Sequence, residues 1–262
     1  MKAVAPGKLI LSGEHAVVYG KPALAMAIDR SAVFELTPQT DRRISFDLPG
    51  SEGCESFTLR ALRDLKRRVE KKYRQFLEGE IGIGYVLSAP ADLFRFAFIN
   101  TLDGLHRTLD SGLVLKLHSS IPVGCGMGSS AATVLSEIRA LGHYLRVDFK
   151  PNWSYEYSLD AEKMQHGRPS GVDSYISLHG GCVHFQQGKV RSVALPRMKM
   201  YIVETGVPDA TTGECVMEVE RNFGRSGIWS EFEDVTNAFE KALKDNDAGK
   251  IHSLVRENNR LL

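Results

Sequence analysis

Residues 121–132 read Ile-Pro-Val-Gly-Cys-Gly-Met-Gly-Ser-Ser-Ala-Ala, and the interpretation of the chain starts from this stretch. Three of its glycines stand at every second position, namely Gly124, Gly126 and Gly128. Without a Cβ, a backbone can turn sharply and approach a ligand closely. Ser129 and Ser130 follow, and apolar residues then recur at intervals of three and four, which predicts a helix. The alternating run Leu113–His118 predicts a strand, so the expected order is strand, glycine loop, helix.

Such a loop directs free backbone N–H groups and the positive end of a helix dipole toward one point, where an anionic phosphate binds well. The stretch is not a Walker A loop, because no Gly-Lys-Ser/Thr follows the glycines. It is not the dinucleotide fingerprint either, because the glycine spacing differs. A glycine-rich turn whose serine caps a helix is the alternative interpretation of the loop on its own.

The composition is that of an ordinary globular protein long enough for two domains. The 262 residues are 43% hydrophobic and 25% charged, and the net charge is +1. This charge gives no overall attraction to nucleic acid or to a membrane surface. No apolar run reaches the roughly 20 residues that cross a bilayer, and the N-terminus lacks the apolar core of a signal peptide. We therefore expect a cytoplasmic protein with free thiols at its scattered cysteines, Cys54, Cys125, Cys182 and Cys215.

A second informative stretch covers residues 3–28. Leu9–Leu11 and Ala23–Ile28 are expected to be strands separated by glycine punctuation. Three ionisable side chains gather in this short span, those of Lys8, Glu14 and His15. A surface hairpin with solvated charges is the alternative interpretation.

Patterns elsewhere predict further elements. The expected strands are Val33–Thr37, Arg43–Leu48, Tyr175–Leu178, Gly181–Gln186 and Lys199–Glu204. The expected helices cover Phe57–Glu78, Leu93–Leu109, Tyr155–Met164, the residues from about Gly213, Trp229–Lys244 and Ala248–Leu262. The first of these helices carries a basic face from Arg60 to Arg74, which we interpret as a solvated face rather than an anion site.

The third informative stretch reads Pro-Ser-Gly-Val-Asp-Ser over residues 169–174. Its proline and glycine predict a turn, and Asp173 follows where a loop can point a side chain inward. Glu162 lies eleven positions earlier, near the end of a predicted helix. Two such carboxylates can divide the work of binding a cation and accepting a proton. Taken singly, they also fit a surface glutamate and a helix-capping aspartate.

Together the three stretches resemble the mevalonate kinase branch of the GHMP kinase superfamily. The resemblance is carried by Ala-Pro-Gly-Lys…Gly-Glu-His-Ala-Val-Val-Tyr-Gly, by Pro-Val-Gly-Cys-Gly-Met-Gly-Ser-Ser-Ala-Ala, and by Glu162 followed by His-Gly-Arg-Pro-Ser-Gly-Val-Asp. It extends from residue 3 to about residue 215, with a weaker similarity in the closing helices. The motif Gly-Glu-His-Ala-Val-Val-Tyr-Gly resembles that of the mevalonate kinases, whereas galactokinases tend to carry Gly-Glu-His-Thr-Asp at this place.

The resemblance implies an α+β, two-domain GHMP kinase fold. The N-terminal ATP-binding domain, of the ribosomal protein S5 domain 2-like type, is expected over residues 1–190, and a ferredoxin-like C-terminal domain over residues 191–262. The family's third motif, a glycine-rich loop near its C-terminus, does not occur here. We expect the C-terminal domain to be incomplete for that reason. A final segment of other origin and a diverged, inactive member are the alternatives.

The implied activity is ATP-dependent phosphorylation of the C5 hydroxyl of mevalonate. In this resemblance Asp173 accepts the hydroxyl proton, while Lys8 keeps Asp173 ionised and favours the developing alkoxide. Glu162 and Ser130, with Ser129 as the substitute, hold Mg²⁺. Glu14, His15 and Thr211 match positions that contact mevalonate, and Thr212 is the substitute for Thr211. The residues matched to ATP binding are Pro122, Gly124, Gly126, Met127, Gly128, Ser129, Ser130 and Ala131.

Three other functions stay open from the sequence. One is a related kinase acting on phosphomevalonate, homoserine or a sugar. Another is an ATP-binding regulator without catalysis, although a mere binder has no need of a base. The third is nucleic-acid binding through the basic helix face, which a steep salt dependence would reveal. The expected partner is a small molecule, with neither nucleic acid nor membrane, and a homodimer is compatible with the resemblance.

Overall fold

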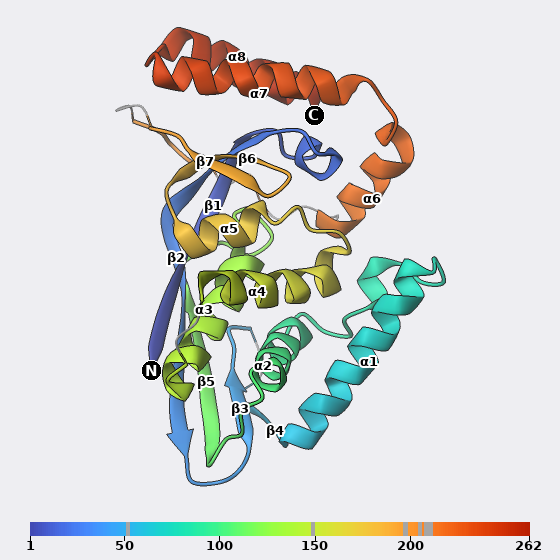
Figure 1. Cartoon of the computed structure of the whole chain (residues 1–262), viewed down its shortest axis with the longest axis vertical. Coiled ribbons are helices and arrows are strands. Elements are labelled where there is room, and N and C mark those ends of the chain that lie inside the picture. Colours follow the sequence, from blue (N-terminus) through green and yellow to red (C-terminus); the bar gives the residue numbers. More distant parts are fainter. Residues whose placement is uncertain (51–52, 148–149, 196–198, 204–205, 207–211) are drawn as a thin grey trace.

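The computed structural model describes residues 1–50, 53–147, 150–195, 199–203, 206 and 212–262, with only the backbone described at residues 151 and 212. Its strands are β1 (Lys2–Ser12), β2 (Ala23–Gln39), β3 (Ile44–Asp47), β4 (Glu55–Phe57), β5 (Gly112–Ser119), β6 (Cys182–Gln186) and β7 (Lys189–Ser192). Its helices are α1 (Leu59–Leu77), α2 (Asp92–Gly104), α3 (Ser129–Leu145), α4 (Pro151–His166), α5 (Val172–His179), α6 (Thr212–Phe223), α7 (Ile228–Lys244) and α8 (Ala248–Leu261). Two short 3-10 helices, η1 (Ala16–Tyr19) and η2 (Ile83–Tyr85), complete the described elements (Figure 1).

One seven-stranded sheet organises the chain around the long strand β2. The strand order is β4-β3-β5-β2-β6-β7, and β1 also pairs with β2. The two ends of β2 have different partners, because Ala32–Gln39 pairs with β5 and Ala23–Met26 with β6. The β3–β5 pair is parallel, and the other described pairs are antiparallel. The sheet is therefore mostly antiparallel, as the family resemblance implies.

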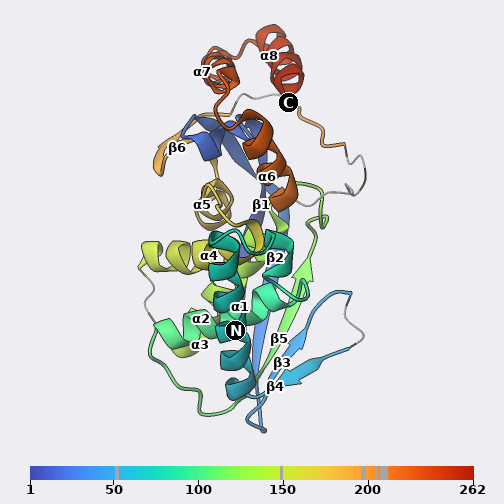
Figure 2. The same cartoon turned by 90° about the vertical axis from the view of Figure 1, so that its right-hand side faces the viewer.

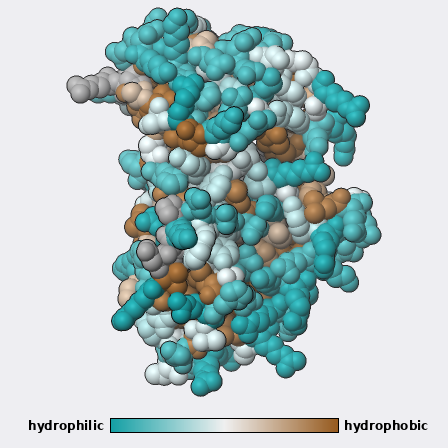
Figure 3. Space-filling model, viewed as in Figure 1, coloured by the Kyte–Doolittle hydropathy of each residue, from teal (hydrophilic) through white to brown (hydrophobic). Residues whose placement is uncertain are grey.

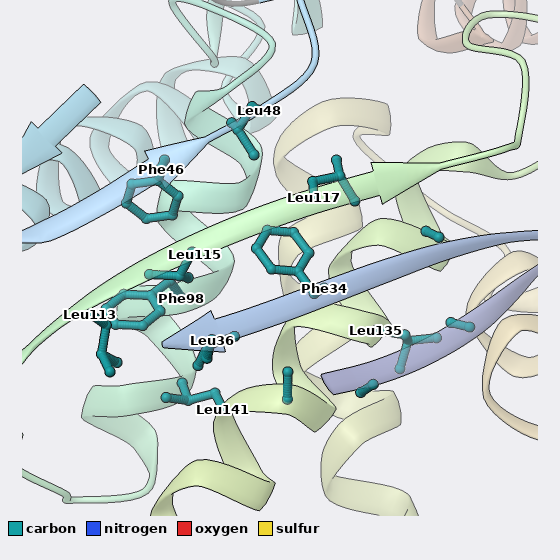
Figure 4. Packing of buried hydrophobic residues seen from close by; sticks show 14 of the residues in the cluster. Phe34, Leu36, Phe46, Leu48, Phe98, Leu113, Leu115, Leu117, Leu135 and Leu141 are labelled. Atoms are coloured by element: carbon teal, nitrogen blue, oxygen red, sulfur yellow. The ribbon is translucent and has the colours of Figure 1, made fainter. Parts of the chain in front are cut away.

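The largest buried cluster lies between the sheet and helices α2 and α3. Figure 4 shows it as interleaved side chains from β2, β3, β5 and the two helices, among them Phe34, Leu36, Phe46, Leu48, Phe98, Leu113, Leu115, Leu117, Leu135 and Leu141. Burying a leucine or phenylalanine of this kind stabilises the fold by roughly 1.5–3 kcal/mol. This packing fixes the end of β5 relative to the start of α3, and the glycine loop connects these two ends.

Helices cover the rest of the molecule in two groups. Helices α1 to α5 stack along one side of the long strands, whereas α7 and α8 lie across the end that carries β6 and β7 (Figures 1 and 2). A buried cluster joins α7 and α8 to β2 and β6 through Leu24, Phe239 and Ile251. The outer face of α1 is hydrophilic, as expected for a solvated basic face (Figure 3). No described helix combines the length and apolar character that a membrane span requires.

Most of the expected elements are confirmed within a few residues. The separate strands expected at Ala23–Ile28 and Val33–Thr37 are parts of one strand, β2, and the short strands β4 and β7 were missed. The four cysteines are free thiols. The domain boundary near residue 190 stays a prediction, as does the ferredoxin-like domain, since the described residues after Ser192 form three helices and no strand.

Two expected strands are wrong. Tyr175–Leu178 belongs to helix α5, because Val172 and Ile176, one helical turn apart, bury the same face against β1, β2 and β6. Of the expected strand Lys199–Glu204, the described residues Lys199–Val203 form no strand. Apolar strand-forming residues need a partner strand, and none pairs with this segment in the described part of the chain, where Tyr201 is 84% exposed.

Glu137 in α3 is a buried carboxyl group whose two oxygens have no hydrogen-bond partner among the described residues. Burial raises its pKa well above the usual value, so the folded protein holds a proton that the unfolded chain releases as the pH rises. Folding stability is therefore full below the unfolded pKa of about 4.3 and declines at higher pH.

We expect Glu137→Gln to have a free energy of unfolding about 1 kcal/mol or more above that of the wild type at pH 8, and therefore to unfold at higher urea concentration. The difference in free energy should shrink toward pH 5. Urea titrations of both proteins at the two pH values measure this. An equal advantage at both pH values would show that Glu137 is not the titrating group.

Candidate active site

The glycine loop joins β5 to α3, as the sequence predicts. All three alternating glycines adopt left-handed backbone conformations, with φ of 80° at Gly124, 70° at Gly126 and 68° at Gly128. Other residue types are strained there, which explains the alternation. The helix α3 begins at Ser129, directly after Gly128. Its first N–H groups therefore open onto the loop, as in helix N-termini that bind phosphate.

An irregularity in the pairing of β1 with β2 lies next to Lys8, beside this loop. Between Pro6 and Lys8 the register shifts so that Gly7 of β1 stands opposite residues 28–30 of β2, and the extra residues belong to β2. The backbone N–H of Lys8 donates to the carbonyl of Met127 at 3.0 Å. A Cβ on Gly7 would lie 2.9 Å from that same carbonyl oxygen, so only glycine allows the approach. This contact ties the first strand directly to the glycine loop.

Lys8 and Asp173 form an ion pair at the same place. The Nζ atom of Lys8 lies 3.2 Å from Oδ2 of Asp173, and the two side chains are 9% and 32% exposed. Asp173 does not lie in a loop, as the sequence suggested, but in the first turn of α5. Gly171, with φ of 88°, turns the chain into this helix, whose buried side then sets the direction of Asp173.

Glu162 lies beside the pair, near the end of α4. Its Oε2 atom accepts from Ser130 Oγ at 3.4 Å and lies 3.4 Å from Nε2 of His166. Its side chain is 3% exposed, and Oε1 has no partner among the described residues. Burial, with a smaller contribution from the Asp173 charge, raises the pKa of Glu162 to about 8. A buried acid of this kind has room for one more electropositive partner.

His166 is a site residue that the sequence analysis did not single out. It lies one turn after Glu162 on α4, and burial lowers its pKa. Its Nδ1 atom has no partner among the described residues. A helical spacing of four between a carboxylate and a histidine was the signal available in the sequence.

Glu14 and His15 follow β1 and lie at the start of η1. Glu14 accepts a hydrogen bond from Asn258 of α8 at 3.1 Å, a second contact that sequence reasoning missed. Burial lowers the pKa of His15, and the nearby Glu14 charge acts in the opposite direction. Thr211 lies outside the described residues, and Thr212 is the first residue of α6, with its side chain not described.

The described structure thus brings together Lys8 of β1, Gly128 and Ser130 at the start of α3, Glu162 of α4 and Asp173 of α5. Lys8 contacts Asp173 and lies against Gly128, Ser130 contacts Glu162, and Glu162 is close enough to feel the charges of Asp173 and Lys8. Pro122, Gly126 and Ala131 lie on the same loop or in the first turn of α3, in continuous chain with Met127 and Ser129. The arrangement suits transfer of a phosphoryl group to a hydroxyl, which needs charge neutralisation and one base.

Comparison with known proteins agrees with this arrangement. Residues 92–181 match the family model "GHMP kinases N terminal domain". The mevalonate kinase of Bos taurus is 30% identical over 235 residues, covering 79% of this chain and 59% of that enzyme. The mevalonate kinase of Methanocaldococcus jannaschii is 26% identical over 264 residues, covering 97% and 79%. The chain is thus similar to mevalonate kinases over most of its length, and its residues 92–181 resemble the N-terminal domain of GHMP kinases.

The GHMP kinase fold expected from the sequence is also confirmed by solved structures. The crystal structure of the Methanococcus jannaschii mevalonate kinase superposes with a TM-score of 0.77 at 24% identity, and covers 100% of this chain and 78% of that one. The chain spans about three fifths of the length of the mammalian relatives it matches.

The contact between the glycine loop and Lys8 predicts the effect of a small substitution. A Cβ at position 128 would lie 2.7 Å from Cγ of Lys8, and the φ of 68° is itself unfavourable for alanine. We expect Gly128→Ala to weaken ATP binding at least tenfold while the protein remains folded. Gly126→Ala is the matched control, since its φ is 70° but no atom lies within 4 Å.

Isothermal titration with a non-hydrolysable ATP analogue measures both variants. Equal losses would assign the effect to backbone strain alone, and unchanged affinity in both would place the nucleotide away from the loop.

Proposed function

We propose that this chain transfers the γ-phosphoryl group of ATP to the C5 hydroxyl of mevalonate. The observation that carries the proposal is the ion pair of Lys8 and Asp173 beside the left-handed glycine loop. The curated relatives at 26–32% identity are mevalonate kinases, which supports mevalonate as the acceptor. The chain spans only part of the first of these relatives, so mevalonate kinase activity is our inference.

In this mechanism Asp173 is the base. Its partly exposed carboxylate can reach a bound hydroxyl, whereas Glu162 is almost fully buried. As the hydroxyl attacks the γ-phosphorus, its proton passes to an Asp173 oxygen, and the bond between phosphorus and the β–γ bridging oxygen breaks to release ADP. The Lys8 ammonium, paired with Asp173 at 3.2 Å, stabilises the negative charge on the attacking oxygen.

The glycine loop and α3 hold the nucleotide. Backbone N–H groups between Gly124 and Ser130 bind the phosphates, and the helix dipole adds favourable potential there. Pro122, Met127 and Ala131 shape the two ends of this loop. Glu14, His15 and Thr211 bind the mevalonate end.

Glu162 and Ser130 fit a magnesium ion. Glu162 Oε1 is buried without a partner, and a metal would satisfy both that atom and the charged form of the carboxylate. No group of three or more His, Cys, Asp and Glu side chains suited to a metal occurs in the described residues. Mg²⁺ takes one or two protein ligands and completes its shell with phosphates and water. When bound, the ion neutralises phosphate charge.

We place the enzyme in the cytoplasm, where its four free cysteines stay reduced. The homodimer stays a prediction.

The experiment that tests the function is ADP release by the purified chain with mevalonate, phosphomevalonate, homoserine or galactose. We expect release with mevalonate, and Asp173→Asn to lower kcat about 100- to 10,000-fold with ATP affinity changed less than about threefold. Asp160→Asn, on an exposed face of α4 beside Lys163, is the matched control and should retain full turnover.

Two results would contradict the proposal. Phosphorylation of another alcohol in preference to mevalonate would overturn the substrate, and near-normal turnover of Asp173→Asn would overturn the base.

The raised pKa of Glu162 predicts pH-dependent metal binding. With a pKa of about 8, the carboxyl group must lose a proton before it binds a cation, so affinity should rise about tenfold between pH 7 and pH 9. Glu162→Gln has no proton to lose and should bind more weakly without that extra rise. Mn²⁺ titration followed by EPR, with a non-hydrolysable ATP analogue present, compares the two. Parallel pH curves would move the metal away from Glu162.

A further inference from the structure

Asn258 in the last turns of α8 reaches the opposite end of the chain. Its residue is 4% exposed, and its side chain contacts three consecutive residues that end β1 and begin the next turn. Its Oδ1 atom accepts from Ser12 Oγ at 2.8 Å and from the backbone N–H of Gly13 at 3.3 Å. Its Nδ2 group donates to Oε2 of Glu14 at 3.1 Å.

The chemistry of these contacts requires an amide at this position. The Gly13 N–H can only donate, and an ionised Glu14 carboxylate can only accept. One side chain that serves both must carry an acceptor and a donor on one short stem. This fixes the orientation of the Asn258 amide, and it also couples the orientation of the Glu14 carboxylate to the backbone of Gly13.

The support behind Asn258 is rigid. Leu261, one turn after Asn258, packs with Trp229 and Phe232 of α7 and with Ala16 of η1. Thr236 of α7 also bonds Ser12 Oγ, at 2.8 Å, and is fully buried. Thr236 therefore shares the anchoring of Ser12, but within the described part of the chain Glu14 receives its hydrogen bond from Asn258 and not from Thr236, which separates the two roles experimentally.

We propose that Asn258 is a positioning residue for the acceptor alcohol, acting through Glu14. It rests on the proposed function, in which Glu14 contacts mevalonate. The Nδ2 donor holds one carboxylate oxygen of Glu14, so the other is directed to the substrate. The Oδ1 acceptor holds the Gly13 backbone, from which Glu14 projects. A helix far along the chain thus sets the geometry of the acceptor subsite and leaves the nucleotide loop unaffected.

The deciding variants are Asn258→Asp, Asn258→Ala and the control Thr236→Val. Asn258→Asp keeps the acceptor for Ser12 and Gly13 but places a negative group against Glu14, at nearly the same size. We expect it to raise the KM for mevalonate at least tenfold, with the KM for ATP within twofold of wild type. Thr236→Val loses one buried hydrogen bond and should lower the Tm, yet leave both KM values within twofold.

A second readout does not need catalysis. Hydrogen–deuterium exchange of the peptide that covers residues 12–20 should accelerate at least fivefold in Asn258→Ala, which loses both functions. It should change less than twofold in Asn258→Asp and Thr236→Val, which keep the bond to Gly13.

The outcomes separate the two hypotheses. If wild type neither binds nor phosphorylates mevalonate, the proposed function fails, and with it the acceptor role, whatever the exchange data show. If wild type is active but all three variants differ only in Tm, Asn258 is merely structural and the inference is overturned. The inference is also overturned if Thr236→Val raises the KM for mevalonate as much as Asn258→Asp does. Unchanged hydrogen–deuterium exchange of residues 12–20 in Asn258→Ala would show that Asn258 does not restrain the Gly13 backbone.

Discussion

The close approach of β1 to the glycine loop is the constraint on which the site depends. At Gly7 and Lys8 the pairing of β1 with β2 is irregular, and the backbone of Lys8 bonds the carbonyl of Met127 where no Cβ on Gly7 would fit. The same approach lays the Lys8 stem against Gly128 and carries its ammonium to Asp173. An interruption of this kind in a strand ladder re-aims side chains. Lys8, the one buried lysine among the described residues, thus lies between a helix start that suits an anion and a carboxylate, and Gly128 leaves room for its stem.

Two buried carboxyl groups on neighbouring helices, those of Glu137 and Glu162, have the same kind of pKa shift but different partners. Glu137 and Glu162 are both desolvated, and desolvation raises the pKa of each. Glu137 has no partner among the described residues, so its burial is a cost to folding with no compensating bond in view. Glu162 is surrounded by Ser130, His166, Lys8 and Asp173, and only one of its oxygens lacks a partner. A cation bound to Glu162 would offset the free-energy cost of burying its carboxylate, so ligand binding could recover the stability lost there.

What the sequence predicted well was local. The strand, glycine loop and helix around residues 121–132 follow from spacing within one short segment, as do the amphipathic helices. The placement of Asp173 in a helix was missed because a run as short as Tyr175–Leu178 fits helix and strand equally until its partners are known. The hydrogen bond from Lys8 to Met127 and the contact between Asn258 and Glu14 could not be predicted for a related reason. They join residues 119 and 244 positions apart, and no periodicity records such a pairing.

The C-terminal helices therefore contribute more to the site than their position in the chain suggests. The proposed catalytic and metal-binding groups lie on β1, α3, α4 and α5, all within residues 1–181. Helix α8 adds none of these groups, yet its Asn258 bonds the segment that carries Glu14. Because α8 is held by α7, and α7 packs on β2 and β6, the position of Glu14 is set by two routes, along the chain from β1 and across from α8. A carboxylate restrained from both sides loses little further freedom on binding substrate, and such pre-organisation favours affinity without any additional contact.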